Sequence, residues 1–218
     1  MNFSIPDHPH LNFGTLFCIG QNYAKHIEEM NSKPADKPVV FLKPRSSLLF
    51  TNETITLPPS SENIHHEVEM VLLIGKKCRF VPVTIANEMI EAVAAGIDVT
   101  ARDIQADAKK NGLPWALSKG FDTFAPVGNF AKISNQDDIQ HLDLSVTVNG
   151  EIRQSGNTSS MLLSTAEIIS YLSEQFTLYP GDLIFTGTPE GVSRIKPGDR
   201  IEAKLGNNLS TLSVHVSS

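Results

Sequence analysis

The sequence has little of what defines several large classes of protein. Its 218 residues include only two cysteines, Cys18 and Cys78, which do not form a CxxC pair. Neither a disulfide framework nor a zinc knuckle is therefore expected. No run approaches the roughly 18 apolar residues of a membrane span, and the N-terminus lacks the basic and apolar regions of a signal peptide. We expect two buried free thiols in a cytoplasmic protein without membrane association.

Excess basic charge is also absent. The formal net charge is -6 at pH 7, whereas nucleic-acid binding relies on clustered Lys and Arg that displace counterions from phosphates. Nucleic acid is therefore not an expected partner. Hydrophobic residues at 40% and charged residues at 19% are typical of a folded globular protein. The length suits one core, so we expect a single domain over 1–218 with a short N-terminal leader, 1–14.

Hydrophobic periodicity and turn residues predict a mixture of strands and helices. Asn149-Gly150 lies between two alternating segments and is a strong hairpin signal. The predicted strands lie at 16–20, 39–43, 64–74, 96–99, 182–186 and within 201–216; the predicted helices lie at 22–30, 85–95, 100–110 and 165–175. Asn22 and Thr100 are the expected caps of two of these helices, and segment 64–99 reads as a βαβ-like crossover. The fold class is α+β with mixed or antiparallel sheets.

Three carboxylates occupy unusual positions. Strand periodicity places Glu67 and Glu69 on one face, and Asp98 interrupts the apolar segment AAGIDVT. A solvated sheet face and a shared proton are both alternatives for the glutamates, but a lone carboxylate in a buried strand needs a partner. An all-oxygen ligand set favours Mg²⁺ or Mn²⁺ over zinc. We expect His65 and His66 to pack or to form supporting hydrogen bonds.

His26 and Glu29 are three residues apart on a predicted helix, so their side chains can share a face. A carboxylate that orients an imidazole creates a general base that can activate water or remove a carbon-bound proton near neutral pH. The alternative is an exposed polar helix face.

Several polar and cationic groups surround these positions in the sequence. Arg102, Gln105 and Lys109 form one helical stripe, and Lys43 and Lys119 stand in apolar or small surroundings. Cations beside a metal site suit an anionic substrate, although a single lysine is more often a surface residue. The turn FTGTPEGV, 185–192, has backbone N–H groups that could hold a carboxylate, or it is simply a proline turn.

Seven segments, in order and spanning nearly the whole chain, together resemble the fumarylacetoacetate hydrolase family and, more narrowly, its small acylpyruvase-like members. They are GQNYAKHIEEM, PVVFLKP, HHEVEMVLLIGKKCR, GIDVTARDIQ, KNGLPWALSKGFDTFAPVG, VNGEIRQSGNTSSM and LYPGDLIFTGTPEGV. The chain departs from the full-length fumarylacetoacetases in lacking their separate N-terminal domain.

The resemblance implies a mixed β-sandwich roll with a few peripheral helices, usually assembled as a homodimer. It implies Mg²⁺ or Mn²⁺ held by Glu67, Glu69 and Asp98, and a His26–Glu29 dyad on a lid helix and loop at about 22–36. It also implies substrate contacts from Lys119, Arg102, Gln105 and Thr188; Lys119 is a candidate catalytic residue as well, and Lys43 a further candidate for substrate binding.

The expected substrate is a small 2-oxo or β-dicarbonyl acid whose reaction passes through an enolate stabilised by the metal. Hydrolysis of a carbon–carbon bond in an acylpyruvate stands first. Tautomerisation or decarboxylation of oxaloacetate and a 2-hydroxymuconate-type isomerisation are the alternatives. A module that binds a metal or ligand without catalysis belongs to a different class, but it would have no use for the His26–Glu29 base.

Overall fold

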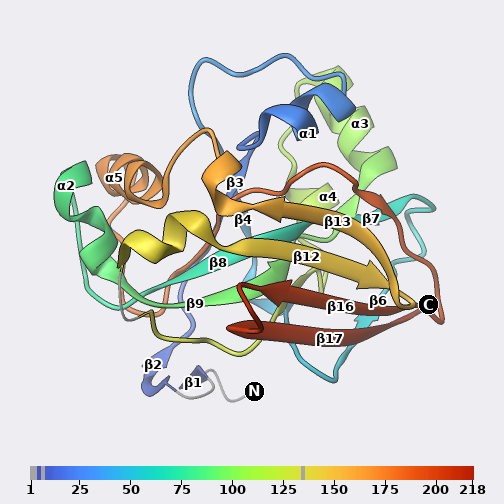
Figure 1. Ribbon diagram of the computed structural model, residues 1–218. Helices are drawn as coiled ribbons and strands as arrows, with labels where there is room; N and C mark the ends of the chain where they lie inside the picture. The colour runs from blue at the N-terminus through green and yellow to red at the C-terminus, as the bar shows by residue number, and fades with distance from the viewer. Residues whose placement is uncertain (1–3, 6–7, 134–135) are drawn as a thin grey trace.

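Two β-sheets packed face to face form the body of the protein (Figure 1). The computed structural model describes residues 4–5, 8–133 and 136–218. A seven-stranded sheet has the order β4-β3-β14-β8-β9-β11-β5, and a five-stranded sheet has the order β13-β12-β16-β17-β6. Strand β12 lies against β8, and β16 and β17 lie against β9. This mixed β-sandwich with few helices confirms the predicted fold class.

The strands are short and the helices peripheral. The strands are β1 (Ser4–Ile5), β2 (His8–Asn12), β3 (Leu16–Gly20), β4 (Val39–Lys43), β5 (Leu48–Phe50), β6 (Thr54–Thr56), β7 (Ile64–His66), β8 (Val68–Ile74), β9 (Ile90–Ile97), β10 (Thr100–Ala101), β11 (Ala125–Val127), β12 (Asp143–Val148), β13 (Glu151–Asn157), β14 (Leu183–Phe185), β15 (Ser193–Arg194), β16 (Arg200–Leu205) and β17 (Ser210–Ser217). The α-helices are α1 (Ala24–Glu29), α2 (Val83–Ala86), α3 (Arg102–Asn111), α4 (Ala116–Lys119) and α5 (Thr165–Gln175), with 3-10 turns η1 (Arg45–Ser47), η2 (Asn87–Met89), η3 (Gln136–His141) and η4 (Thr158–Ser160). None of the helices in the described ranges has the length and apolar sequence needed to cross a membrane.

The antiparallel strand β8 is buried on both faces, as is β9 from Ala92 onwards. Met70 and Leu72 point into the core between the two large sheets. Val71 and Leu73 point the other way, into a second core that Leu11 and other residues of the N-terminal segment help to cover. The predicted leader 1–14 therefore packs on the sheet where it is described; residues 1–3 and 6–7 lie outside the described residues.

The helix predicted at 85–95 is wrong. Only α2 and η2 are helical there, and β9 begins at Ile90. Alanine and glutamate favour a helix in this segment, but Ala92, Ala94 and Ala95 are fully or almost fully buried between the two cores. Small side chains let neighbouring layers approach, so tertiary packing overrides the local propensity. Strands β8 and β9 are antiparallel neighbours, and the predicted βαβ crossover is therefore also wrong.

The strand predicted at 64–74 is divided at Glu67. Its first part, β7, pairs with β10 and β15 in a three-stranded sheet, and its second part, β8, enters the seven-stranded sheet. The backbone N–H of Asp98 donates to Glu67 O at 2.8 Å, and the N–H of Val68 donates to the side chain of Gln154 at 2.9 Å. The division lies beside the predicted carboxylate cluster.

Several other predicted elements are confirmed. Strands β12 and β13 form the hairpin, and both Asn149 and Gly150 have positive φ, as the tight turn requires. Helix α5 begins with a capping box between Ser164 and Glu167. Strands β16 and β17 form the C-terminal hairpin.

Asn22 does not cap the helix that follows it. Tyr23 is the N-cap residue of α1, without a side-chain hydrogen bond. The buried Asn22 side chain instead donates to Leu163 O at 3.2 Å and to Thr186 O at 2.8 Å, and it accepts from Leu163 N at 2.7 Å. It joins the start of α1 to two distant segments.

We therefore expect Asn22→Ala to lower the free energy of unfolding by about 2 to 4 kcal/mol, because it leaves the buried carbonyl of Thr186 and partly buried backbone groups of Leu163 without partners. Urea denaturation measures this loss. Asn207→Ala, at an exposed turn position, is the matched control and should change stability by less than about 0.5 kcal/mol. Equal stability of the two variants would contradict the role assigned to Asn22.

Candidate active site

One cavity gathers most of the candidate residues from distant parts of the chain. Its lining includes side chains from α1, from the ends of β8 and β9, from α3 and α4, and from the segment after β14. Eight candidates line it: His26, Glu67, Glu69, Asp98, Arg102, Gln105, Lys119 and Thr188. Glu29 and Lys43 are the two candidates that do not.

The three carboxylates come together as expected. Glu67, Glu69 and Asp98 each offer an oxygen atom within 4.8 Å of the others, and all three residues are buried. Glu67 and Glu69 flank Val68, and Asp98 follows the neighbouring strand β9 directly. The antiparallel pairing of β8 with β9 places these positions at the same end of the sheet.

The surroundings of each carboxylate set its pKa. Burial raises the pKa of Glu69 well above its ordinary value, and the charges of Asp98 and Glu67 add to this effect. Burial also raises the pKa of Asp98, although Lys119 and Lys43 oppose the shift. For Glu67, burial acts in the same direction but is outweighed by Arg102 and Lys119, which hold its pKa well below the ordinary range. Glu69 is thus the least compensated charge in the cluster.

This cluster fits a divalent cation of the Mg²⁺ or Mn²⁺ type. Its donor set consists of three carboxylates, which suit a hard cation. Lys43 Nζ lies 2.7 Å from Asp98 Oδ1 as an ion pair, yet this oxygen accepts no hydrogen bond among the described residues. A cation between the carboxylates would also relieve the mutual repulsion that raises the pKa of Glu69.

Two cations border the cluster within the cavity. Lys119 is buried and joins Glu67 Oε2, at 2.7 Å, to Asp98 Oδ2. Arg102 pairs with Glu67 Oε1 and donates to Gln105 Oε1 at 2.8 Å. The attraction of Asp98 and Glu67 outweighs burial and raises the pKa of Lys119, so its ammonium remains charged at neutral pH.

Lys43 lies behind Asp98 rather than on the cavity wall. Its ammonium donates to the carbonyl oxygens of Val99, Lys119 and Phe124 at 3.1, 2.5 and 2.7 Å. These bonds hold its positive charge next to Asp98 Oδ1. In this arrangement Lys43 orients Asp98 and has no direct route to a ligand in the cavity.

The predicted dyad is present on α1. Glu29 Oε2 lies 3.1 Å from His26 Nδ1, so Nε2 is the ring nitrogen that does not face Glu29. Glu29 Oε1 also accepts from the N–H of Gly191 at 2.9 Å. Glu29 therefore orients His26 and at the same time fastens α1 to the turn at 185–192.

This turn holds carboxylates of the protein itself. The N–H of Gly187 donates to Glu69 Oε2 at 2.7 Å, as the N–H of Gly191 does to Glu29. The sequence indicated a backbone that could hold a carboxylate, but it did not show that two candidate site residues supply them. Thr188 lines the cavity, and its hydroxyl accepts from Gln154 Nε2 at 2.8 Å.

The histidines before β8 are not part of the cluster. Gln154 Oε1 lies 2.9 Å from His66 Nδ1, and Ser193 Oγ lies 2.8 Å from His66 Nε2. Burial lowers the pKa of His66 and lowers that of His65 to about 4. His66 is thus a neutral supporting residue, in agreement with the sequence-based expectation.

The N-cap of helix α3 lies one residue later than predicted. It is Ala101, because Thr100 belongs to β10 and its hydroxyl donates to Asp98 O at 3.1 Å. Gly112 ends the helix in the left-handed conformation, as expected. Arg102 is the first residue of the helix and lies directly beside Glu67.

The sequence did not predict two aromatic residues that line the cavity. Phe41 and Trp115 line the cavity and pack together with ring centroids 5.7 Å apart. Lys119 Nζ lies 4.8 Å from the centroid of Phe41, and Lys109 Nζ lies 5.1 Å from that of Trp115. Such contacts favour a cation over the ring face. Their only signal in the sequence is proximity to a lysine, in VVFLKP and PWALSKG.

Helix α1 and the loop after it should exchange amide hydrogens faster than β8. Residues 31–38 are largely exposed and lack helix or strand structure, whereas β8 is wholly buried. Oxalate is a compact mimic of a pyruvate enolate. Added together with Mg²⁺, it should slow amide hydrogen exchange over residues 22–36 by closing this segment on the cavity. Hydrogen exchange with mass spectrometry measures both states. Equal protection with and without oxalate would contradict a lid.

Comparison with known proteins identifies the family of the chain. Residues 15–217 match the family described as fumarylacetoacetate (FAA) hydrolase C-terminal. The chain is 45% identical over 188 residues to the mitochondrial oxaloacetate tautomerase FAHD1 of Homo sapiens, covering 86% of this chain and 85% of that protein.

Two crystal structures have the same fold. Fumarylpyruvate hydrolase from Pseudomonas aeruginosa, in complex with Mn²⁺ and pyruvate, has a TM-score of 0.90 and 36% identity, covering 95% of this chain and 91% of that one. The 2-hydroxyhepta-2,4-diene-1,7-dioate isomerase from Mycobacterium marinum has a TM-score of 0.82 and 36% identity, covering 95% and 75%. With this match over nearly the whole chain and these relatives, the chain belongs to the fumarylacetoacetate hydrolase family.

Proposed function

We propose that this protein is a divalent-metal-dependent oxaloacetate tautomerase, which interconverts the keto and enol forms of oxaloacetate. The observation that carries the proposal is a His26–Glu29 dyad at the same cavity as three carboxylates and a row of cations. The 45% identity to a protein of that name supports it. Hydrolysis stood first in the sequence-based ranking; the relatives favour the tautomerase alternative.

The charge of the cavity favours a dianionic substrate. Glu67, Glu69 and Asp98 are matched in formal charge by Lys43, Arg102 and Lys119, which contact the cluster. A divalent cation would then leave these six side chains and the ion with a net charge of +2, equal and opposite to the charge of oxaloacetate near pH 7. Lys109 and Gln105 line the same wall. We assign the second carboxylate of the substrate to this side.

Glu67, Glu69 and Asp98 would hold Mg²⁺ or Mn²⁺. The bound ion would withdraw electrons from the 2-oxo group and so stabilise the enolate that forms during proton transfer.

His26 is the base that moves the proton. In the direction from keto to enol, its Nε2 takes a proton from C3, and the imidazolium then gives a proton to the 2-oxo oxygen. His26 ends neutral, and the substrate changes only in the position of one hydrogen. Glu29 accepts from Nδ1–H and stabilises the imidazolium that results. Lys119 adds a positive charge to the same cavity, which favours the enolate form.

A substrate panel tests this proposal. The full chain, freed of metal with a chelator and resupplied with Mg²⁺ or Mn²⁺, is assayed with enol-oxaloacetate, keto-oxaloacetate and a series of acylpyruvates. We expect the metal-dependent conversion of the enol to have the highest kcat/KM. The ultraviolet absorbance of the enol measures this conversion. A higher kcat/KM for cleavage of an acylpyruvate would reject the tautomerase in favour of a hydrolase.

Acylpyruvate hydrolysis is the second candidate. The structural neighbour with a TM-score of 0.90 is a fumarylpyruvate hydrolase that holds pyruvate. The same dyad could activate water instead of removing a proton from carbon. The two reactions differ in products, since only hydrolysis releases pyruvate, and enzymatic detection of pyruvate separates them.

We further propose a cytoplasmic homodimer. An apolar groove is lined by residues 39–42 and 113–116, and Leu42, Leu113 and Leu117 are 45%, 56% and 76% exposed. Burial of such side chains against a second copy would favour association. Light scattering coupled to gel filtration tests this, and Leu117→Asp should shift the mass towards that of a monomer.

A further inference from the structure

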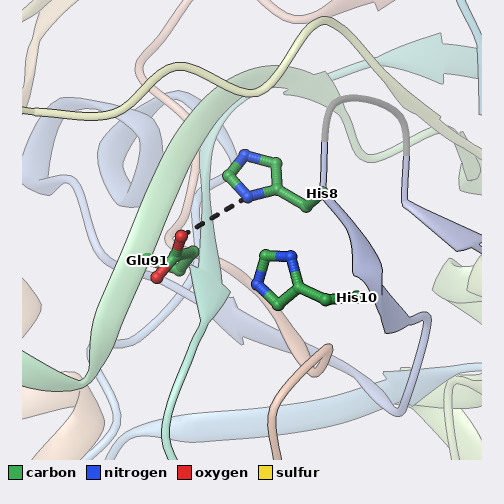
Figure 2. Close-up of side chains that lie close together, drawn as sticks. All are labelled: His8, His10 and Glu91. Atoms are coloured by element: carbon green, nitrogen blue, oxygen red, sulfur yellow. Dashed lines mark ion pairs between the residues drawn. The ribbon is translucent and has the colours of Figure 1, made fainter.

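His8, His10 and Glu91 form a second cluster of side chains that could hold a metal ion (Figure 2). His8 and His10 stand two residues apart on β2, and their rings lie on the same side of that strand. Glu91 reaches them from β9. Each residue offers a ligand atom within 4.8 Å of the other two. Glu91 and Asp98 lie near opposite ends of β9, seven residues or about 23 Å apart along the strand.

One ring nitrogen of His8 has no hydrogen-bond partner among the described residues. His8 is only 3% exposed, and this nitrogen, Nδ1, is buried. This atom lies 3.5 Å from Glu91 Oε1. Ligand atoms of a tetrahedral zinc site are about 3.3 Å apart when each bond is about 2.0 to 2.1 Å long. The pair formed by His8 and Glu91 is thus already close to the spacing that one ion would require.

The third ligand has the freedom to complete the site. His10 is exposed, and its ring centroid lies 6.0 Å from that of His8. An exposed imidazole can rotate at little cost. Two imidazoles and one carboxylate are borderline ligands, which suit Zn²⁺, Co²⁺ or Ni²⁺ better than Mg²⁺. From these observations we propose that His8, His10 and Glu91 form a second metal site, selective for a zinc-type divalent ion and separate from the active site.

One neighbour competes with such an ion. Lys132 Nζ lies 3.2 Å from Glu91 Oε1, and its side chain is 72% exposed. Its ammonium pairs with the Glu91 carboxylate that would bind the metal. Because the side chain is exposed, it can rotate into solvent when an ion binds. Occupation of the site would fasten the N-terminal segment, through β2, to the central strand β9. The role of the ion is therefore structural, and it should stabilise the fold as a bound ligand does.

Calorimetry with the full chain tests the site. Zn²⁺ is titrated in the presence of a large excess of Mg²⁺, which would compete for the carboxylate cluster, and without any chelating anion. We expect one Zn²⁺ per chain, with an affinity at least ten-fold weaker in His10→Ala and unchanged in the matched control His215→Ala, which alters another exposed histidine. Lys132→Ala should bind Zn²⁺ more tightly than the parent, because the competing ammonium is gone.

Two further measurements keep the result independent of activity. Co²⁺ should give the visible absorption bands of a tetrahedral site in the parent and lose them in His10→Ala. Zn²⁺ should raise the unfolding temperature of the parent more than that of His10→Ala. Equal Zn²⁺ affinity in the parent and His10→Ala, or weaker binding in Lys132→Ala, would overturn the proposal. Because Mg²⁺-dependent turnover does not involve these residues, failure here would leave the proposed tautomerase untouched.

Discussion

Glu69→Gln should abolish metal-dependent turnover while leaving the metal-free protein at least as stable as the parent. The amide can still accept from the N–H of Gly187, so the bond that positions this side chain survives. What disappears is the buried negative charge that burial, Asp98 and Glu67 disfavour. Affinity for Mg²⁺ or Mn²⁺ should fall by more than about ten-fold, since even losses of groups behind the ligands cost 10- to 100-fold.

The pH dependence of stability follows from the same charge. The pKa of Glu69 is raised above its ordinary value of 4.5 in the folded protein, so the folded state binds more protons than the unfolded state. The contribution of protonated Glu69 to the free energy of unfolding is complete below about pH 4.5 and is lost as pH rises through the raised pKa. In a chelator, the parent should therefore lose more stability than Glu69→Gln between pH 4.5 and neutrality.

Added metal should make the parent more stable than Glu69→Gln. At 100 times its dissociation constant, an ion that binds only the folded state stabilises it by about 2.7 kcal/mol. Thermal unfolding at pH 7 should show this gain with Mn²⁺ in the parent and little or none in Glu69→Gln. Glu151→Gln, at an exposed position, is the control and should behave as the parent. A metal response of parental size in Glu69→Gln would remove Glu69 from the ligand set.

Local chemistry predicted the residues of the site better than the path of the backbone. The spacing of Glu67 and Glu69 and the isolation of Asp98 were visible in the sequence, because a buried carboxylate stands out against apolar neighbours. The helix predicted at 85–95 failed, because alanines that favour a helix in isolation serve here as the small side chains of a doubly buried strand. Only the three-dimensional structure, in which two cores pack against β9, shows why small side chains are needed there.

The roles of single residues depended on contacts across long stretches of sequence. Lys43 is separated from Asp98 by 55 residues, and its burial behind that carboxylate depends on the pairing of β4 with β3 and on the position of residues 119–124. Asn22 looked like a helix cap, yet its partners Leu163 and Thr186 lie more than 140 residues away. Such partners leave no periodic signal, so no local pattern could assign them.

His26→Ala should separate proton transfer from metal binding. Loss of the imidazole removes the base while leaving Glu67, Glu69 and Asp98 in place, so turnover of enol-oxaloacetate should fall by roughly 10²- to 10⁴-fold. Binding of Mn²⁺ and of oxalate should remain within a few-fold of the parent, measured by calorimetry. His215→Ala is the matched control and should leave the rate unchanged.

Decarboxylation of oxaloacetate provides the internal comparison. That reaction needs a metal to accept electrons as carbon dioxide leaves, but it needs no base to remove a proton from C3 and no attacking water. His26→Ala should therefore lower decarboxylation, followed by release of carbon dioxide, much less than tautomerisation, whereas Glu69→Gln should lower both together. A parental rate of tautomerisation in His26→Ala would show that the His26–Glu29 pair only fastens α1 to Gly191. Proton transfer would then have to come from another group of the cavity.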